Sequence, residues 1–410
     1  MRKPTNLLIR PPVVFVTLFF ITLFATYCSK TPSNDQVVAA YLATHPLTQS
    51  IYTVDTTTSP PPGIILTTPY NESILPIDQS TGFLLIMDQS GKALQEKYTP
   101  GTAFCLNRWI INGQIRYTYL VNDPGALRLL GVDQNAGYAI VADSSLNTLQ
   151  RINFTPFDSL FQAGQALDVH DFILLSDSDY ITLSYINKYV TNIPARLTSA
   201  TSVPVLAPLI EEVKNGTVVW HWDGSADTSF YANSVEGNIF TDSLAAQDYM
   251  HMNSMFVDPR DNNLICSMRN QDQVIKINRQ TGAIVWRLGG ANSDFALTPN
   301  QVFLRQHNAT LVDSNRTLLI FDDGDSTLRP YSRVVEFQLD EANKVITSST
   351  QFKIPEPFTL LTGSVQKLGP NYFIGGGTAN YLLEINYTTG QKISEFIGTE
   401  PTYRAYKYLQ

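Results

Sequence analysis

The chain has 410 residues, is 43% hydrophobic and only 16% charged, and carries 28 basic against 36 acidic residues, a net charge of −8. It is too apolar to be disordered, and its length suits two or three average domains or one large all-β domain. The acidic balance excludes a protein that binds nucleic-acid phosphates, because such binding depends on clustered Lys and Arg.

The N-terminal segment has the layout of an export signal. Three basic residues within the first ten precede an apolar run over 13–27, which is shorter than the roughly 20 residues that span a bilayer comfortably. Cys28 follows, so residues 1–28 resemble a bacterial lipoprotein signal, although Tyr27 stands where a small residue is normal. We expect an exported lipoprotein, periplasmic or anchored to the outer membrane through lipid on Cys28. An uncleaved signal anchor with an incidental Cys28 is the alternative.

The remainder of the chain reads as a series of short strands. Residues 29–80 are predicted to be a linker or a small β-appendage, and 81–410 repeat a pattern of apolar strands and polar turns without long helical periodicity. Clear copies of the pattern occur at 82–95, 137–152, 263–288, 317–346 and 371–396. A period of roughly 40–50 residues with several strands per unit is typical of propeller blades. We predict an all-β propeller with six blades.

Three of the five histidines occupy the same position in this repeat. His170, His251 and His307 each open a short strand, which a polar turn and a second apolar strand follow. Because the innermost strands of a propeller line its channel, the three side chains are expected to converge on one site. His45 and His221 lack this position and are expected to be structural.

An amide and a guanidinium accompany these histidines. Asn253 lies two residues after His251, on the same face of its strand, and Arg269 ends the following strand near the channel rim. Three imidazoles are a common zinc or iron set, so a metal-dependent hydrolase or oxygenase is one interpretation. Arg269 would repel a metal ion, however, and no carboxylate obviously accompanies the histidines. A site for a negatively charged transferring group, attacked by a neutral imidazole, fits these residues better.

Several ordered motifs resemble those of the bacterial arylsulfate sulfotransferases (arylsulfotransferase, ASST). They are a His-x-Asn pair with Arg eighteen residues after the His, a Trp-Arg-Leu-Gly-Gly strand end, a Gln-His-x-Ala strand start and a Ser-Arg-Val-Val-Glu strand, with a His-Asp strand start upstream. The resemblance covers roughly residues 125–400, and it implies a six-bladed propeller independently of the repeat.

The resemblance also implies an activity and a role for each residue. A sulfuryl group would pass from a phenolic sulfate ester to a phenol by a ping-pong route through a sulfohistidine, with no nucleotide donor, metal or other cofactor. His307 would be the nucleophile. His251, Asn253 and Arg269 would bind the sulfuryl oxygens, and His170 would assist donor binding or proton transfer.

The chain departs from the family at several points. Asn308 follows the nucleophilic His where the family commonly has Asp, so an acidic neighbour that orients the imidazole or its strand would be missing. The short N-terminal region leaves the oligomeric state open. Cys105 and Cys266 lie in apolar strand-like runs and are expected to be buried and free. A propeller that binds a ligand or a protein without catalysis is the alternative to an enzyme.

Overall fold

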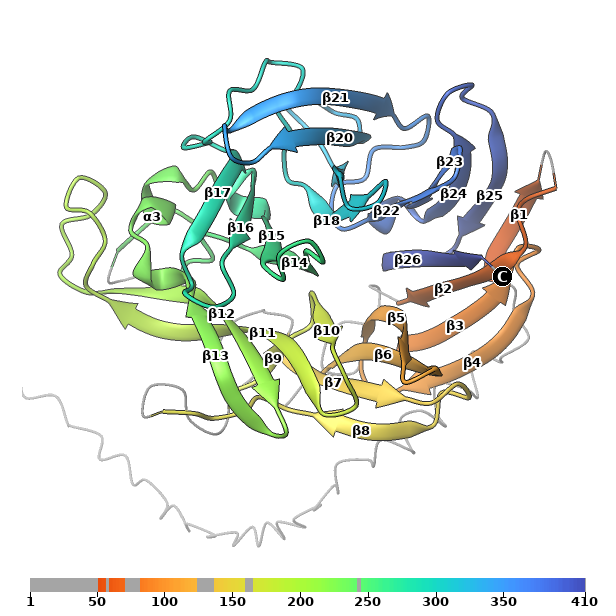
Figure 1. Cartoon of the computed structure of the whole chain (residues 1–410), viewed down its shortest axis with the longest axis horizontal. Coiled ribbons are helices and arrows are strands. Elements are labelled where there is room, and N and C mark those ends of the chain that lie inside the picture. The colour runs from red at the N-terminus through yellow and green to blue at the C-terminus, as the bar shows by residue number, and fades with distance from the viewer. Residues whose placement is uncertain are drawn as a thin grey trace, which may run out of the picture.

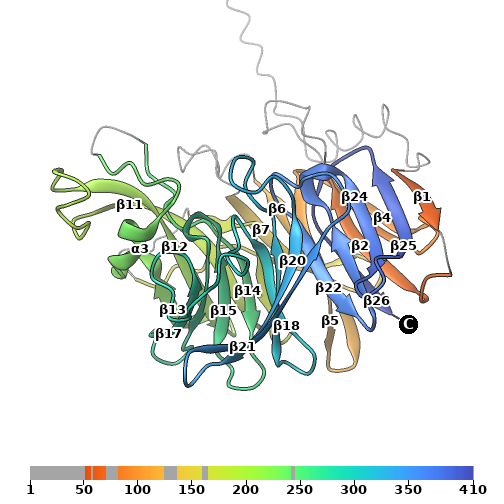
Figure 2. The ribbon, with the colours of Figure 1, turned by 90° about the horizontal axis from the view of Figure 1, so that it is seen from above.

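The chain forms a ring of six antiparallel sheets around a central axis, as the computed structural model shows from two directions (Figures 1 and 2). The structure describes residues 51–56, 59–70, 82–123, 136–158, 165–241 and 245–409. Each sheet is one blade, which confirms the prediction of a six-bladed all-β propeller. The predicted signal peptide, Cys28 and His45 lie outside the described residues.

Each of the first three blades has an inner strand beside the channel and three strands outside it. Blade I consists of β26 (Thr402–Leu409), β2 (Gly63–Pro69), β3 (Gly82–Asp88) and β4 (Ala93–Thr99). Blade II consists of β5 (Ala103–Ile111), β6 (Gln114–Asn122), β7 (Ala136–Ala142) and β8 (Thr148–Ile152), and β9 (Leu167–Asp168) pairs with β7. Blade III consists of β10 (Phe172–Leu174), β11 (Asp179–Val190), β12 (Val203–Lys214) and β13 (Thr217–Asp223).

The remaining three blades repeat this order from the channel outward. Blade IV consists of β14 (Met252–Val257), β15 (Leu264–Met268), β16 (Gln273–Ile277) and β17 (Ile284–Gly289). Blade V consists of β18 (His307–Val312), β19 (Thr317–Asp322), β20 (Arg333–Asp340) and β21 (Val345–Lys353). Blade VI consists of β22 (Ser364–Leu368), β23 (Asn371–Gly375), β24 (Tyr381–Asn386) and β25 (Lys392–Gly398), with β1 (Tyr52–Thr56) on its outer edge.

The burial of each strand follows its place in the blade. β7 and β15 are buried at every residue, because neighbouring blades cover both faces of a middle strand, and both read as continuous apolar runs. The outermost strands β8 and β21 are mostly exposed and polar. The sequence pattern therefore distinguishes the middle strands of a blade from the outermost strand, as well as strands from turns.

The two ends of the described chain meet in blade I. β26 pairs antiparallel with β2, so the C-terminal strand supplies the inner strand of the blade that the N-terminal strands build. β1 pairs with β25 at the edge of blade VI. The strands at 52–56 and 63–69 fall in the region predicted to be a linker or appendage, and their pairing places them within the propeller. The propeller therefore begins before residue 81, the predicted start, because the partners of these two strands lie at the far end of the sequence.

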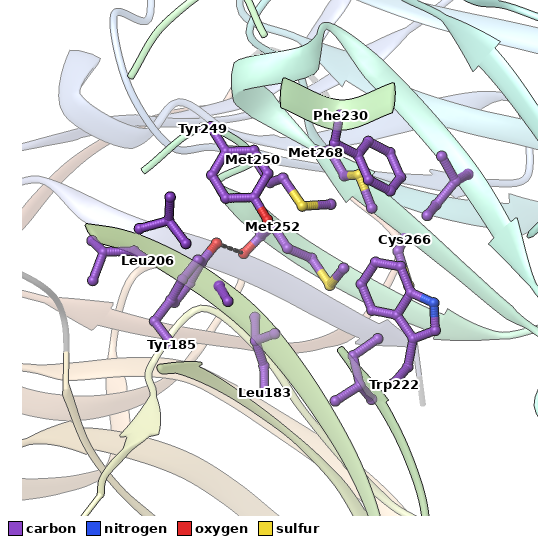
Figure 3. Close-up of a cluster of buried hydrophobic side chains, with 14 of the residues drawn as sticks. Leu183, Tyr185, Leu206, Trp222, Phe230, Tyr249, Met250, Met252, Cys266 and Met268 are labelled. Atoms are coloured by element: carbon purple, nitrogen blue, oxygen red, sulfur yellow. Dashed lines mark hydrogen bonds between the residues drawn. The ribbon is translucent and has the colours of Figure 1, made fainter. Parts of the chain in front are cut away.

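A dense hydrophobic cluster between blades III and IV supports the wall of the channel (Figure 3). Met250 and Met252 are both buried in it, and the Tyr185 hydroxyl donates to the Met252 carbonyl at 3.2 Å. His251, between the two methionines, is not part of this cluster. The cluster thus fixes the backbone on both sides of this histidine.

Both cysteines in the described part of the chain, Cys105 and Cys266, are buried and free, as predicted. Across the same residues, none of the helices has both the length and the apolar character needed to cross a membrane.

Candidate active site

Three histidines meet at one end of the central channel. His170 and His251 stand just before β10 and β14, and His307 is the first residue of β18, so all three open inner strands of consecutive blades. The rings of His170 and His251 lie 4.8 Å apart between centroids, edge to face, and the charge of either would lower the pKa of His307. The structure therefore brings together the three histidines that the repeat predicted to converge. His221, in contrast, lies on the outer strand β13 and contacts Phe157.

An aspartate is bonded to the Nδ1 atom of each histidine. The N···O distances are 2.6 Å for His170 and Asp168, 2.5 Å for His251 and Asp248, and 2.7 Å for His307 and Asp323. The expectation that no carboxylate accompanies the histidines was therefore wrong, because Asp323 reaches His307 from the end of the neighbouring strand β19. An acceptor on Nδ1 fixes the ring and leaves Nε2 for the site.

His307 is suited to be a neutral nucleophile. Its side chain is buried, and burial, then the positive charge of Arg269, lower its pKa well below the usual value. Burial raises the pKa of Asp323 well above the usual value, and Arg269 opposes that rise. Because the two groups share a hydrogen bond, they titrate as a pair. When the carboxyl is ionised and Nδ1–H donates to it, Nε2 carries the lone pair that a nucleophile needs.

Two guanidinium groups lie at the mouth of this site. Arg269 donates from Nη1 to Glu236 at 2.8 Å and to Asn270 at 2.7 Å, and its Nε is buried without a hydrogen-bond partner among the described residues. Arg305, two residues before His307, has its Nη1 3.6 Å from the same Glu236. The half-exposed Glu236 thus lies beside both guanidinium groups, and Arg305 also lies 3.9 Å from Asp272 and from Asp325. The unpartnered Nε of Arg269 suits an oxygen of an oxyanion.

Asn253 is fully buried and bonds to the neighbouring blade. Its Nδ2 donates to the carbonyl of Gln306, the residue before His307, at 2.8 Å. The backbone carbonyl of Asn253 accepts from the hydroxyl of Tyr403 at 3.0 Å and from Nη2 of Arg404. One N–H of the Asn253 amide therefore positions the strand that carries His307. The role of this residue in binding sulfuryl oxygens stays a prediction, for which the amide has its second N–H.

β26 contributes two residues that the sequence analysis missed. The ring of Tyr403 lies 5.5 Å from that of His170 and 6.3 Å from that of His307, between centroids. Arg404 is buried, and its Nη1 lies 3.2 Å from Asp171. The alternation of aromatic and basic residues in this strand was the available signal, but the strand lies beyond the last recognised copy of the repeat.

The inner strands begin with strained backbone. Cys105, His251 and Asn308 have φ values of 52°, 49° and 51°, and the strand pairing shifts register beside each of them. A non-glycine residue in this left-handed region costs about 1–2 kcal/mol and persists only where its surroundings fix it. Such strain concentrates at functional sites, and here it marks the end of the channel where the histidines meet.

Asn308 connects two blades and does not orient the imidazole beside it. Its Oδ1 accepts from the backbone N–H of Val365 in the next blade at 2.9 Å. Asp171 has the same role two blades earlier in the ring, where it accepts from the N–H of Met255 at 2.8 Å. An Asn satisfies this backbone group as an Asp would, and Asp323 supplies the acidic partner of His307.

The arrangement offers little to a metal ion. Within the ranges that the structure describes, no group of three or more His, Cys, Asp and Glu side chains is placed to hold one. Each carboxylate on Nδ1 leaves Nε2 open, and the positive charge of Arg269 beside His307 disfavours a cation there. These charges suit negative oxygens around a neutral imidazole.

Comparisons with known proteins agree with the motifs. The family model described as Arylsulfotransferase (ASST) matches residues 112–406. No curated protein matches the chain. Among solved structures, a protein of unknown function from Bacteroides caccae is 10% identical, with 85% of this chain and 100% of that chain covered and a TM-score of 0.47. Apo AztD from Citrobacter koseri is 8% identical, with 85% and 99% covered and a TM-score of 0.39. At these scores neither structure bears on function.

Proposed function

The chain belongs to the arylsulfotransferase (ASST) family, and from this membership we propose that it moves a sulfuryl group from a phenolic sulfate ester to a phenol through a sulfohistidine on His307. Arylsulfotransferase activity in general follows from the family. The observation that supports the covalent route is the buried His307, bonded through Nδ1 to Asp323 and held neutral beside Arg269.

In the first half-reaction, Nε2 of His307 attacks the sulfur of the donor. The N–S bond forms as the bond from sulfur to the phenolic oxygen breaks, and the departing phenolate takes a proton from His170 or His251. Arg269, the two imidazoles and Asn253 bind the sulfuryl oxygens, whose charge is dispersed in a loose transition state by analogy with phosphoryl transfer. Asp323 stabilises the positive charge that develops on His307.

In the second half-reaction, the acceptor phenol occupies the place of the departed product. Its oxygen attacks the sulfur of the sulfohistidine, the N–S bond breaks, and the phenolic proton returns to the imidazole that gave one up. His307 is again neutral, so the cycle needs no net proton, metal or nucleotide. A ping-pong order follows, because one site serves both phenols in turn.

The decisive experiment measures release of 4-nitrophenolate from 4-nitrophenyl sulfate by the full-length protein in detergent, with and without phenol. Phenol-dependent release, together with a sulfo adduct on His307 in mass spectra taken without phenol, is the expected result. Release that ignores phenol would indicate a sulfatase, and no release with any donor would favour a ligand-binding propeller. His307→Ala should abolish turnover, and His221→Ala, on an outer strand, is the matched control.

We also propose that the protein is exported and anchored by lipid on Cys28. The support is the N-terminal sequence, with its basic start, short apolar run and Cys. Mass spectrometry of the mature N-terminus tests this proposal. A lipid-modified Cys28 is expected, and an intact residue 1 would indicate the signal anchor instead.

A further inference from the structure

The central channel contains a cavity beyond the histidines. Its volume is 420 Å³, and all six inner strands line it. Three of the lining segments follow the histidines along their strands: 171–173 follow His170, 254–257 follow His251 and 308–312 follow His307. The histidines themselves do not line the cavity. The cavity therefore lies farther along the channel than the candidate active site. Its volume is within the range of small-molecule sites.

Arg404 and its partners form a layer between the two spaces. Its guanidinium bonds to Asp171 at 3.2 Å, to the Tyr406 hydroxyl at 3.3 Å and to the carbonyl of Asn253. Tyr403, the preceding residue in β26, packs against the histidines and does not line the cavity. A molecule in the cavity would thus meet Arg404 and not the imidazoles.

The cavity wall combines apolar surface with cations. Its apolar side chains include Ile173, Val257, Leu311 and Leu368. Three cationic residues also line it, Arg404, Arg108 and Lys367, against one carboxylate, Asp171. Asp171 is paired with Arg404, and Lys367 is paired with Asp313 at 2.8 Å and Glu336 at 3.0 Å.

Of the three cationic residues that line the cavity, Arg108 forms no ion pair with a carboxylate of the described residues. Its guanidinium lies over the ring of Tyr408 at 5.4 Å. The Nε atoms of Arg108 and of the deeply buried Arg404 are both enclosed without a hydrogen-bond partner in the same part of the chain. Buried donors are nearly always satisfied, so the two guanidinium groups that line this cavity keep donors that an anionic ligand can satisfy.

We propose that this cavity is a second ligand site, for an amphiphilic anion with an aromatic or aliphatic body and one carboxylate or sulfonate head. The body lies against the apolar side chains of the channel, and the head bonds to Arg108. Arg404 offers its Nε to an acceptor at the inner end. The site is separate from the histidines and does not depend on the proposed transfer reaction.

Fluorescence titration of the full-length protein with 8-anilinonaphthalene-1-sulfonate tests the proposal, because this aryl sulfonate has no transferable sulfuryl ester. A saturable signal with one probe per chain is expected. Decanoate should displace the probe, and decanol, with the same body and no charge, should be at least tenfold weaker. 1-Naphthalenesulfonate is the aromatic counterpart of decanoate. If only one of the two displaces the probe, the site takes that kind of body, aliphatic for decanoate and aromatic for 1-naphthalenesulfonate. Equal potency of decanol and decanoate would overturn the anionic head.

Two variants locate the binding. Arg108→Gln should raise the Kd of the probe at least tenfold, and Thr310→Trp, which fills the cavity from β18, should abolish saturable binding. Arg151→Gln is the matched control, since Arg151 also lies over a tyrosine ring, that of Tyr138 at 3.6 Å, but on an outer strand. It should leave the Kd unchanged, as should His307→Ala. Loss of binding in His307→Ala, or unchanged binding in Arg108→Gln, would overturn the proposal.

Discussion

The residues near the start of the inner strands serve different purposes on the two sides of the ring. Blades III to V place His170, His251 and His307 at the start of the inner strand, each with a carboxylate on Nδ1. At the same end of the channel, blades II and VI place Cys105, which donates to the His170 carbonyl at 3.0 Å, and Ser364, which donates to the Ala405 carbonyl at 3.0 Å.

This contrast separates structural from chemical use of the polar residues at this end of the channel. The polar atoms of Cys105 and Ser364 bond to the backbone of the neighbouring blade. These side chains therefore join blades and offer no free donor to a substrate. The histidines are held by side-chain carboxylates, which occupy one nitrogen and leave the other. We infer that a reactive group arises on this ring where a carboxylate, and not a backbone carbonyl, fixes the side chain.

The largest expected effect comes from the carboxylate of the proposed nucleophile. Asp323→Asn should lower kcat by about 10³-fold, because an amide favours the wrong tautomer of His307 and cannot stabilise the charge that develops on it. Asp168→Asn makes the same change on His170 and should cost only about tenfold if His170 assists and does not attack. Steady-state kinetics of the two folded variants measures the difference. Equal losses would remove the distinction between the two histidines.

The pH dependence should follow the His307–Asp323 pair. Protonation of the pair removes the state with a free Nε2, so on the acid side the rate should rise with pH by about tenfold per unit. The rise ends where His170 or His251 loses the proton that it gives to the phenolate. The raised pKa of Asp323 places the acid limb above the usual range of a carboxyl, and the lowered pKa of His307 keeps the imidazole neutral above that limb. The profile of kcat/KM against pH is the measurement. A rate that falls with rising pH across this range would contradict the assignment.

The other half of the ring should tolerate change with little loss of activity. Cys105→Ser keeps a donor to the His170 carbonyl and should alter kcat less than about threefold. Ser364→Ala removes the two hydrogen bonds to Ala405, at 3.0 Å each, and should lower the free energy of unfolding by about 1–3 kcal/mol with kcat still within about threefold. Denaturant titration and kinetics of the same samples test both parts. A hundredfold loss of kcat in either variant would break the comparison between the halves.

Much of the fold was accessible from the sequence because its determinants are local. Apolar alternation and turn residues recur in every blade, and the positions of His170, His251 and His307 within that repeat predicted their convergence. Pairing between distant segments was not accessible in this way. β2 and β26 join the N- and C-terminal parts of the described chain, and neither strand shows its partner in its own residues.

The site was predicted in part for the same reason. Arg269 lies beside the histidines as its place at a strand end indicated. Asp323 was missed because it reaches His307 from the end of the next strand, sixteen residues along the chain. Tyr403 was missed because β26 joins the N-terminal blade I only by pairing with the distant β2. Side chains that meet only through strand pairing or closure of the ring leave no short-range spacing to recognise.

The smallest expected effect, and the sharpest test of the division between joining and reacting groups, is at Asn308. Asn308→Asp keeps an acceptor for the Val365 N–H and should change kcat less than about threefold. Asn308→Ala is the control, since it leaves that buried N–H without an acceptor and should lower the free energy of unfolding by about 1–3 kcal/mol. Kinetics and denaturant titration of the pair separate the two roles. If Asp raised kcat tenfold, position 308 would act on the imidazole, and Asp323 could not be its sole orienting acid. If only the free energy of unfolding changes, Asn308 holds neighbouring blades together, and Asp323 alone orients the imidazole of His307 for the reaction.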